Sequence, residues 1–267
     1  MSQQRTGAAR AAQRGYSLVE LSVAMVIALF LLGGLLSVLQ GTRKTSTNQS
    51  LLAQLQDNER IAMTMISGVV QSAGYYPNPE TAVLETELPV SGSFTTSGQA
   101  VAGDVNAVAA LGNTLTVRFK ADAGEDVIDC SGQSNAGGGA AVSRVNQFSV
   151  RQDSPGTAPY LACSLDNGAT FIKLVNNVQK MEILYGVNTS AADSNSLGGA
   201  VDAYLTVDKM TAVYWTNVCS IKVVLTFVNP LYQVNGQPPT PGQPATVQFS
   251  RVIGVMSRLG VNVVNVT

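Results

Sequence analysis

The chain has 267 residues, of which 45% are hydrophobic and 12% are charged, with a formal net charge of -1 and no histidine. The lack of histidine removes the commonest general base and the commonest zinc or copper ligand, and the sequence has no P-loop or G-x-S-x-G elbow. A chain without a basic patch cannot neutralise nucleic-acid phosphates. Composition therefore argues against an enzyme, a cofactor-dependent protein and a nucleic-acid-binding protein.

The first element along the chain is a basic segment followed by an apolar run. Arg5, Arg10 and Arg14 precede the run, and no acidic residue lies among them. Residues 21–39 supply about the 20 apolar residues that a helix needs to cross a hydrocarbon core. The positive-inside rule then places the N-terminus in the cytoplasm. We predict one membrane-spanning helix and an extracytoplasmic C-terminal part.

A single carboxylate, Glu20, lies at the start of this apolar run. A carboxylate inside a membrane span costs roughly 2.5 to 3.5 kcal/mol at the helix centre and less near the interface, so it needs a partner. Cleavage between Gly15 and Tyr16 would create an α-amino group, of pKa about 8, one helical turn from Glu20 or within reach of a neighbouring subunit's Glu20. Secretory signals are cut after their apolar stretch, so cleavage here would retain the helix.

Residues 15–20, GYSLVE, resemble the class III signal of type IV pilins and type II secretion pseudopilins, whose common form is GFTLIE. The resemblance implies that an aspartyl prepilin peptidase cuts after Gly15 and that Tyr16, which replaces the usual phenylalanine, is N-methylated. It also implies that Glu20 helps a subunit to dock into a filament by pairing with a neighbour's amino terminus. The alternative is a plain signal anchor, which would gain nothing from an early carboxylate in the bilayer.

The helical pattern continues beyond the membrane span without a proline until Pro77. We predict one helix over residues 16–72, roughly 85 Å long, whose second half packs an apolar stripe on a globular domain. Gly33, Gly34 and Gly41 are positions where it could bend. The pattern recurs at three- and four-residue steps, at Leu51, Leu52, Leu55, Asn58, Ile61, Met65 and Val69.

The remaining residues, 73–267, are enough for one β-rich domain with its own core. Alternating or β-branched runs predict its strands, and runs of glycine, serine, asparagine and proline predict its loops. With a leader at 1–15 and the helix at 16–72, the layout is α+β: a long helix packed on an antiparallel β-sheet domain. This is the type IV pilin fold that the resemblance implies. The predicted strands are 115–120, 146–151, 171–174, 181–186, 221–228, 247–253 and 261–266, and the longest loops are 131–139, 188–199 and 235–243.

Three cysteines lie outside the membrane in this topology. Cys130 and Cys163 are the predicted disulfide, because each borders a turn-rich segment in an oxidising compartment. Such a bridge would stabilise the fold by about 3 to 4 kcal/mol through loop-closure entropy. Cys219, within the apolar strand candidate 215–227, is interpreted as a buried free thiol. Pairings that involve Cys219 stay open, since connectivity cannot be deduced from sequence.

Four acidic residues precede Cys130: Asp122, Glu125, Asp126 and Asp129. A glycosidase-like pair of carboxylates is one interpretation of this cluster, because spacing alone does not distinguish it from other arrangements. We favour a solvated acidic turn, and we predict no catalytic residue.

A second group of oxygen-bearing residues lies in the loop at 188–199 and just after it. Asp193, Asn195 and Asp202 are the side chains that a hard cation would prefer in a glycine-rich loop. In the PilW-type minor pilins, a D-x-D-x-D-G-like loop often follows a Y-G-V segment. Here residues 185–187 read YGV, but the loop has lost most of its acids. We therefore predict no metal site.

Later residues narrow the resemblance. Over most of its length the chain resembles a PilW-type minor pilin. The features that carry this resemblance are the two cysteines that bracket a Gly/Ser loop, the YGV segment, Asp202 with Tyr204, and Trp215 leading into residues 218–227. The J-type minor pseudopilin of type II secretion is similar in layout.

The resemblance implies a minor pilin of the inner membrane, single-pass with a periplasmic C-terminal domain, that later enters the pilus at the cell surface. It would take part in pilus initiation and assembly within a minor-pilin complex at the tip. Its partners would be the prepilin peptidase, other minor pilins, the major pilin and a tip adhesin. The alternatives are a type II secretion minor pseudopilin and a membrane-anchored adhesin or binding module.

Overall fold

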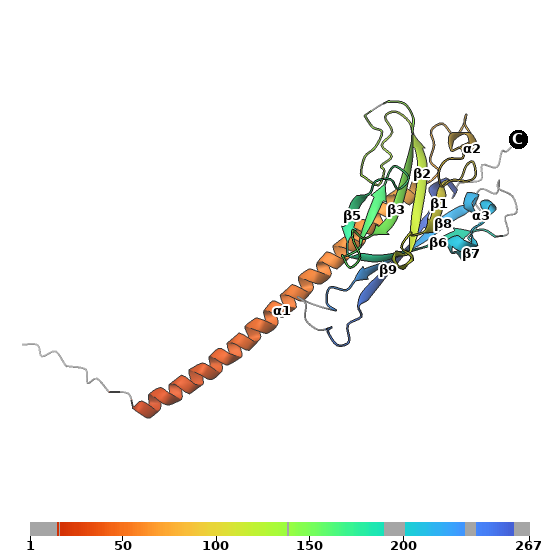
Figure 1. The fold of residues 1–267 in the computed structure, drawn as a ribbon. Helices are drawn as coiled ribbons and strands as arrows, with labels where there is room; N and C mark the ends of the chain where they lie inside the picture. Colours follow the sequence, from red (N-terminus) through yellow and green to blue (C-terminus); the bar gives the residue numbers. More distant parts are fainter. Residues whose placement is uncertain (1–14, 16, 138, 190–200, 233–238, 259–267) are drawn as a thin grey trace, which may run out of the picture. The chain divides into compact units, whose positions relative to one another are not determined.

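The computed structural model of the chain describes residues 15, 17–137, 139–189, 201–232 and 239–258 (Figure 1). Its longest element is helix α1, Leu18–Gln71, close to the predicted bounds. The helix continues through the three glycines at which a bend was considered. By compactness the chain divides into a first unit that ends at Ser50 and a second that begins at Leu51.

In the first unit, α1 presents its apolar side chains to the outside. Among the described residues it is the one helix long and apolar enough to cross a membrane, with a mean hydropathy of 2.5 over its most apolar 18 residues, none of which is buried. Leu18 and Phe30, for example, are 83% and 81% exposed. An apolar surface of this extent needs lipid or other protein around it.

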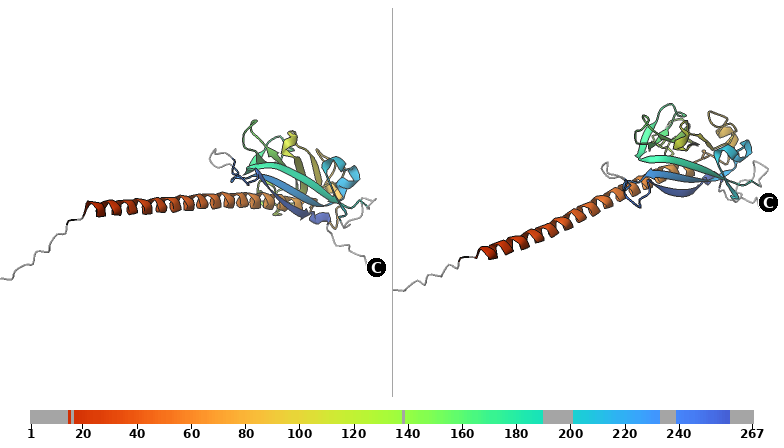
Figure 2. Two further views of the ribbon diagram at one scale, coloured as in Figure 1. Left: turned by 90° about the horizontal axis from the view of Figure 1, so that it is seen from below. Right: turned by 60° about the horizontal axis from the view of Figure 1, so that its bottom comes forward.

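The second unit contains two antiparallel sheets, which Figure 2 shows from two further directions. In the described part of this unit, three short 3-10 helices and two short α-helices lie between or next to the strands. The five-stranded sheet runs in sequence order, β1 (Val101–Val105), β2 (Asn113–Ala121), β3 (Val142–Arg151), β4 (Tyr160–Ser164) and β5 (Ile172–Asn176). The four-stranded sheet has the order β7 (Ala203–Leu205), β6 (Val178–Val187), β8 (Val218–Val228) and β9 (Thr246–Gly254). The short elements are α2 (Leu84–Glu87), η1 (Ala109–Leu111), η2 (Val207–Lys209), α3 (Ala212–Thr216) and η3 (Met256–Arg258).

One hydrophobic core joins the second half of α1 to both sheets. On β2 the core face alternates as the pleat requires, with Leu115, Val117 and Phe119 fully buried. The sheets are also linked directly, because the backbone N–H of Ile183 in β6 donates to Asn113 Oδ1 at the start of β2, at 3.2 Å. The residues that α1 contributes to the core are Leu55, Ala62, Met63, Ile66, Val69 and Val70.

Helix α1 ends before the predicted prolines. Gly74 takes a positive φ of 73°, and its N–H donates to the carbonyl of Arg118 in β2 at 3.0 Å. A glycine adopts this backbone conformation at no steric cost. The end of the helix is thus set by a turn that docks onto the sheet.

The α+β prediction is confirmed, with two sheets where one was predicted. Six predicted strands correspond to β2, β3, β5, β6, β8 and β9, and the seventh, at 261–266, lies outside the described residues. The sequence did not predict β1, β4 and β7. These strands have only three to five residues, and β1 contains Gly103 and Asp104, which disfavour strands.

The strand candidate at 215–227 was partly wrong. Trp215 lies in the short helix α3, and β8 begins only at Val218. The hydroxyl oxygen of Thr211 accepts from the N–H of Tyr214 at 3.4 Å, which caps the start of the helix.

Candidate functional site

The predicted processing and docking residues lie at the N-terminal end of α1. Glu20 lies in the first helical turn and is exposed, and the N–H of Leu21 donates to the carbonyl of Ser17 at 3.1 Å. A carboxylate in the first turn is favoured by the helix macrodipole. Tyr16, the predicted site of N-methylation, lies outside the described residues.

Gly15 has no neighbour that would require a glycine. A Cβ atom at this position would meet nothing within 4 Å among the described residues. Packing among the described residues therefore does not explain why this position is a glycine.

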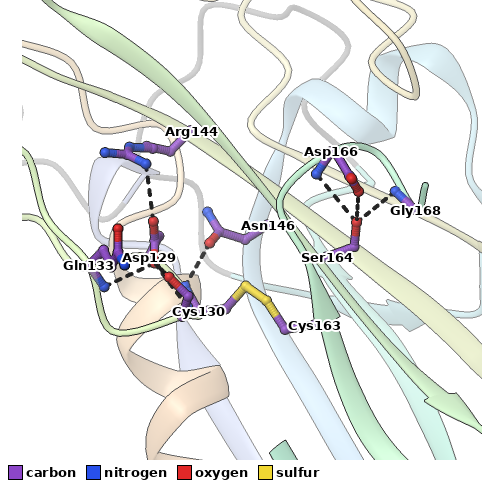
Figure 3. Close-up of a disulfide and its surroundings, with 10 residues drawn as sticks. Asp129, Cys130, Gln133, Arg144, Asn146, Cys163, Ser164, Asp166 and Gly168 are labelled. Atoms are coloured by element: carbon purple, nitrogen blue, oxygen red, sulfur yellow. Dashed lines mark hydrogen bonds and ion pairs between the residues drawn. A yellow bond between two sulfur atoms is a disulfide. The ribbon is translucent and has the colours of Figure 1, made fainter. Parts of the chain in front are cut away.

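The predicted disulfide between Cys130 and Cys163 is present (Figure 3). Cys130 lies in the loop between β2 and β3, Cys163 lies in β4, and their Cα atoms are 6.2 Å apart. Both residues are buried. The N–H of Cys130 also donates to Asn146 Oδ1 in β3 at 2.8 Å. The bridge and this hydrogen bond together tie the loop to the middle of the five-stranded sheet.

The acidic cluster before Cys130 is only partly the solvated turn that was predicted. Asp129 is 2% exposed. Its Oδ1 accepts hydrogen bonds from the N–H of Ser131 at 2.9 Å, the hydroxyl of Ser131 at 2.6 Å and the N–H of Gln133 at 3.1 Å, and its Oδ2 lies 3.3 Å from Arg144 Nη1. Figure 3 shows Asp129 joined by dashed lines to Arg144 and to Gln133 of its own loop. The carboxylate of Asp129 can be buried because backbone donors and the Arg144 guanidinium surround it.

Glu125 serves a second structural contact in the same loop. The hydroxyl of Tyr75 donates to its Oε1 at 2.5 Å, and the N–H of Asp122 donates to its Oε2 at 2.6 Å. The hydrogen bond to Glu125 is the main reason why the pKa of Tyr75 is raised, with burial second. These contacts hold the loop in place.

Cys219, the third cysteine, is a buried free thiol at the start of β8. Burial raises its pKa, and the thiol donates weakly to the carbonyl of Asn217 at 3.4 Å. A thiol that stays protonated is a poor nucleophile.

The candidate metal residues fall at the edge of what the structure describes. Asp193 and Asn195 lie outside the described residues. Asp202 accepts from the N–H and the hydroxyl of Thr189, both at 2.9 Å. Within the described ranges, no three His, Cys, Asp or Glu side chains come close enough to hold a metal ion.

The burial of Arg118 was not predicted from the sequence. Arg118 is 2% exposed. Its guanidinium donates to the carbonyls of Gln99 at 2.6 Å, Leu88 at 2.9 Å and Pro89. The guanidinium also lies 4.2 Å from the centre of the Phe94 ring. Burial lowers its pKa to about 10, so it stays charged at neutral pH. Arg118 lies between Val117 and Phe119, whose side chains face the core, so its own side chain is on the outward face of the strand and would be expected to contact solvent. Only the loop that covers it explains the burial.

Comparison with known families gives two matches at separate parts of the chain. The family described as prokaryotic N-terminal methylation motif matches residues 10–36, which include Gly15, Tyr16 and Glu20. The family described as type IV pilus-assembly protein W matches residues 147–258, from β3 to η3. Comparisons with curated proteins and with solved structures gave no significant match. The N-terminal methylation motif, the PilW match and the α+β fold together support a PilW-type minor pilin of the type IV pilus.

Proposed function

We propose that this minor pilin takes part in initiation and assembly of the pilus, within a minor-pilin complex at the tip. The observation that carries the proposal is the lone carboxylate of Glu20 at the start of an exposed apolar helix, inside a matched N-terminal methylation motif. The PilW match over the globular part supports pilus assembly as the process. The role is partner binding and not catalysis.

The proposal includes processing at the N-terminus. The leader, residues 1–15, is removed by the prepilin peptidase after Gly15, and the new N-terminal residue, Tyr16, is methylated. The mature chain then consists of the long helix, to about residue 72, and the β-rich domain, 73–267. No described atom lies within 4 Å of a Cβ at Gly15, which favours this proposal because a peptidase requires access to the backbone at the cleavage site.

Before assembly, the apolar part of α1 holds the protein in the inner membrane as a single-pass anchor, with the C-terminal domain in the periplasm. In the pilus the same helix surface packs against the helices of other minor pilins and of the major pilin. Its exposed leucine, valine and phenylalanine side chains suit both environments, since both are apolar. A tip adhesin is a further partner of the periplasmic domain.

Within the filament, Glu20 pairs with the amino terminus of a neighbouring subunit. The carboxylate is unfavourable in the bilayer on its own. Pairing with a positive charge removes this penalty in the assembled state, so it favours incorporation of the subunit. The carboxylate therefore links cleavage of the leader to docking.

The test replaces Glu20 in the full chain and expresses it in a strain that lacks the wild-type gene. Glu20→Ala should sharply reduce surface pili in electron micrographs and abolish twitching motility, at unchanged protein level in the membrane. Asp57→Ala is the matched control, because it removes an exposed carboxylate from the same helix beyond the apolar run. Normal piliation with Glu20→Ala would contradict the docking role.

A second comparison addresses the position in the pilus. Deletion of the gene should prevent pilus formation, and the tagged full chain should co-purify in detergent with the other minor pilins. A deletion strain that forms normal pili but fails to secrete type II substrates would overturn the pilus assignment in favour of a secretion pseudopilin.

A further inference from the structure

A polar pocket lies on the outer face of the five-stranded sheet, opposite the hydrophobic core. Its volume is about 380 Å³, within the range of about 300 to 1,000 Å³ that small-molecule sites occupy. The end of β1, the start of β2, strand β3 and the β4–β5 loop line it. Phe148 and Val150 of β3 belong to the core, so the alternate residues Gln147, Ser149 and Arg151 face the pocket.

The strand register brings polar residues of three strands into one row. Thr114 pairs with Asp104 of β1, and the β2–β3 register, which pairs Leu115 with Phe148, places Thr114 opposite Ser149. Neighbouring strands lie about 4.8 Å apart, and alternate residues on one strand lie about 6.8 Å apart. The row from Asp104 to Ser149 and the column along β3 therefore place several polar side chains on one small area of the sheet.

Two polar atoms of the pocket residues have no hydrogen-bond partner. They are Ser149 Oγ, on a residue that is 3% exposed, and Gln147 Oε1, and neither has a partner within the part of the chain that the structure describes. Buried polar atoms in folded proteins are normally hydrogen-bonded. Gly168 of the β4–β5 loop, with a φ of 89°, allows the loop backbone to approach, since a Cβ there would lie 2.6 Å from Gln147 Oε1. The pocket thus brings together polar atoms that the fold itself does not satisfy.

The charges of the pocket favour a neutral ligand. Its charged lining residues are one carboxylate, Asp104, and one guanidinium, Arg151, which lies 4.0 Å from the centre of the Phe171 ring. One carboxylate and one guanidinium balance in net charge, so neither an anion nor a cation gains a net electrostatic advantage in the pocket. A zwitterion would engage both charges but leave the neutral groups of Gln147 and Ser149 unmatched.

We propose that this pocket binds an uncharged carbohydrate of one or two sugar rings. A sugar hydroxyl can both donate and accept, so it can donate to Gln147 Oε1, exchange a hydrogen bond with Ser149 Oγ, donate to Asp104 and accept from Arg151. Vicinal hydroxyls supply several such groups on one rigid ring. The proposal is independent of the role of Glu20 in assembly.

The test uses the full chain in detergent and saturation-transfer NMR with a panel of glucose, galactose, mannose, N-acetylglucosamine and lactose. At least one of these sugars should bind, and glucuronate and free lysine should not. Ser149→Ala and Gln147→Glu should each weaken binding about ten-fold. Ser143→Ala is the matched control, because Ser143 is exposed on the same strand and face outside the pocket, and it should bind like wild type.

Thermal unfolding separates binding from folding. Ser149→Ala should unfold at the same temperature as wild type or higher, because it removes a buried hydroxyl that has no partner among the described residues. Failure of every neutral sugar in the panel to bind would overturn the proposal. So would equal binding of the charged compounds, or equal behaviour of Ser149→Ala and Ser143→Ala.

Discussion

The hydroxyl of Tyr185 in β6 lies directly against the backbone of Gly103 in β1, so that a Cβ atom on Gly103 would overlap it. Tyr185 is fully buried, and its ring packs edge-on against Trp215 with the ring centroids 4.7 Å apart. Its hydroxyl has no hydrogen-bond partner among the described residues. Burial raises its pKa, so the hydroxyl stays neutral. The two sheets approach one another here because position 103 has no side chain.

The first prediction concerns this contact. Gly103→Ala should destabilise the fold by about 1 to 3 kcal/mol, because the added methyl group forces Tyr185 to move. Tyr185→Phe alone should be neutral or stabilising, and it should reduce the effect of Gly103→Ala in the double variant. Chemical denaturation of the full chain in detergent measures all three. Strictly additive effects would show that the two residues do not interact.

The second prediction concerns the disulfide. Its 33-residue separation corresponds to about 3 to 4 kcal/mol of loop-closure entropy. Cys130→Ser with Cys163→Ser should therefore lower the free energy of unfolding by about that amount, and Cys219→Ala should have a much smaller effect. Mass spectrometry after alkylation of the unfolded protein provides an independent check. One thiol should react without reductant and three with it, and any other count would contradict the pairing.

The third prediction is a dependence of stability on pH. Hydrogen bonds from the hydroxyl of Ser164, and from the hydroxyl and the N–H of Thr170, hold the pKa of Asp166 well below its usual range. A carboxylate with a lowered folded-state pKa stabilises the fold above its unfolded-state pKa, about 3.9, and loses this contribution as the pH falls through the folded-state value.

Asp166→Asn should accordingly lower the unfolding temperature by a constant amount above about pH 5, and the difference from wild type should shrink on acidification below about pH 4. Asp126→Asn, at an exposed position in the β2–β3 loop, is the matched control and should follow wild type at each pH. A difference that stays constant down to the lowest pH would show that the Asp166 carboxylate is not the titrating group.

The fourth prediction concerns processing. Gly15→Val should leave the leader attached, because the peptidase needs close backbone approach at a residue without a side chain. The fold should not respond, since a Cβ at Gly15 meets no described atom within 4 Å. Intact-mass spectrometry of the membrane fraction distinguishes the leader-bearing and mature forms. Ser17→Ala should be processed normally, and a mature mass for Gly15→Val would refute cleavage at this position.

The sequence alone determined the features that depend on neighbouring residues. The apolar run with Glu20, the helical spacing of α1 and the alternation in β2, β6 and β8 are local patterns. The predicted face of α1 was partly wrong, because Leu55 and Val69 join the core whereas Leu52 and Ile61 are 39% and 46% exposed. For such patterns, the preferred conformation follows from the periodicity of the chain. The cysteine pair also followed from local context, because both residues border turn-rich segments. The longest helix and most strands were therefore predictable.

Tertiary structure decided which polar groups are buried and what surrounds them. Asp129 appeared to be one of four solvated acids, and it is buried because Arg144, 15 residues away, and the loop backbone surround it. Arg118 is covered by a loop 19 to 30 residues before it. The pocket at Ser149 exists because β1, β2 and β3 align in one register. Burial and alignment depend on contacts between distant residues, and local periodicity carries no information about them.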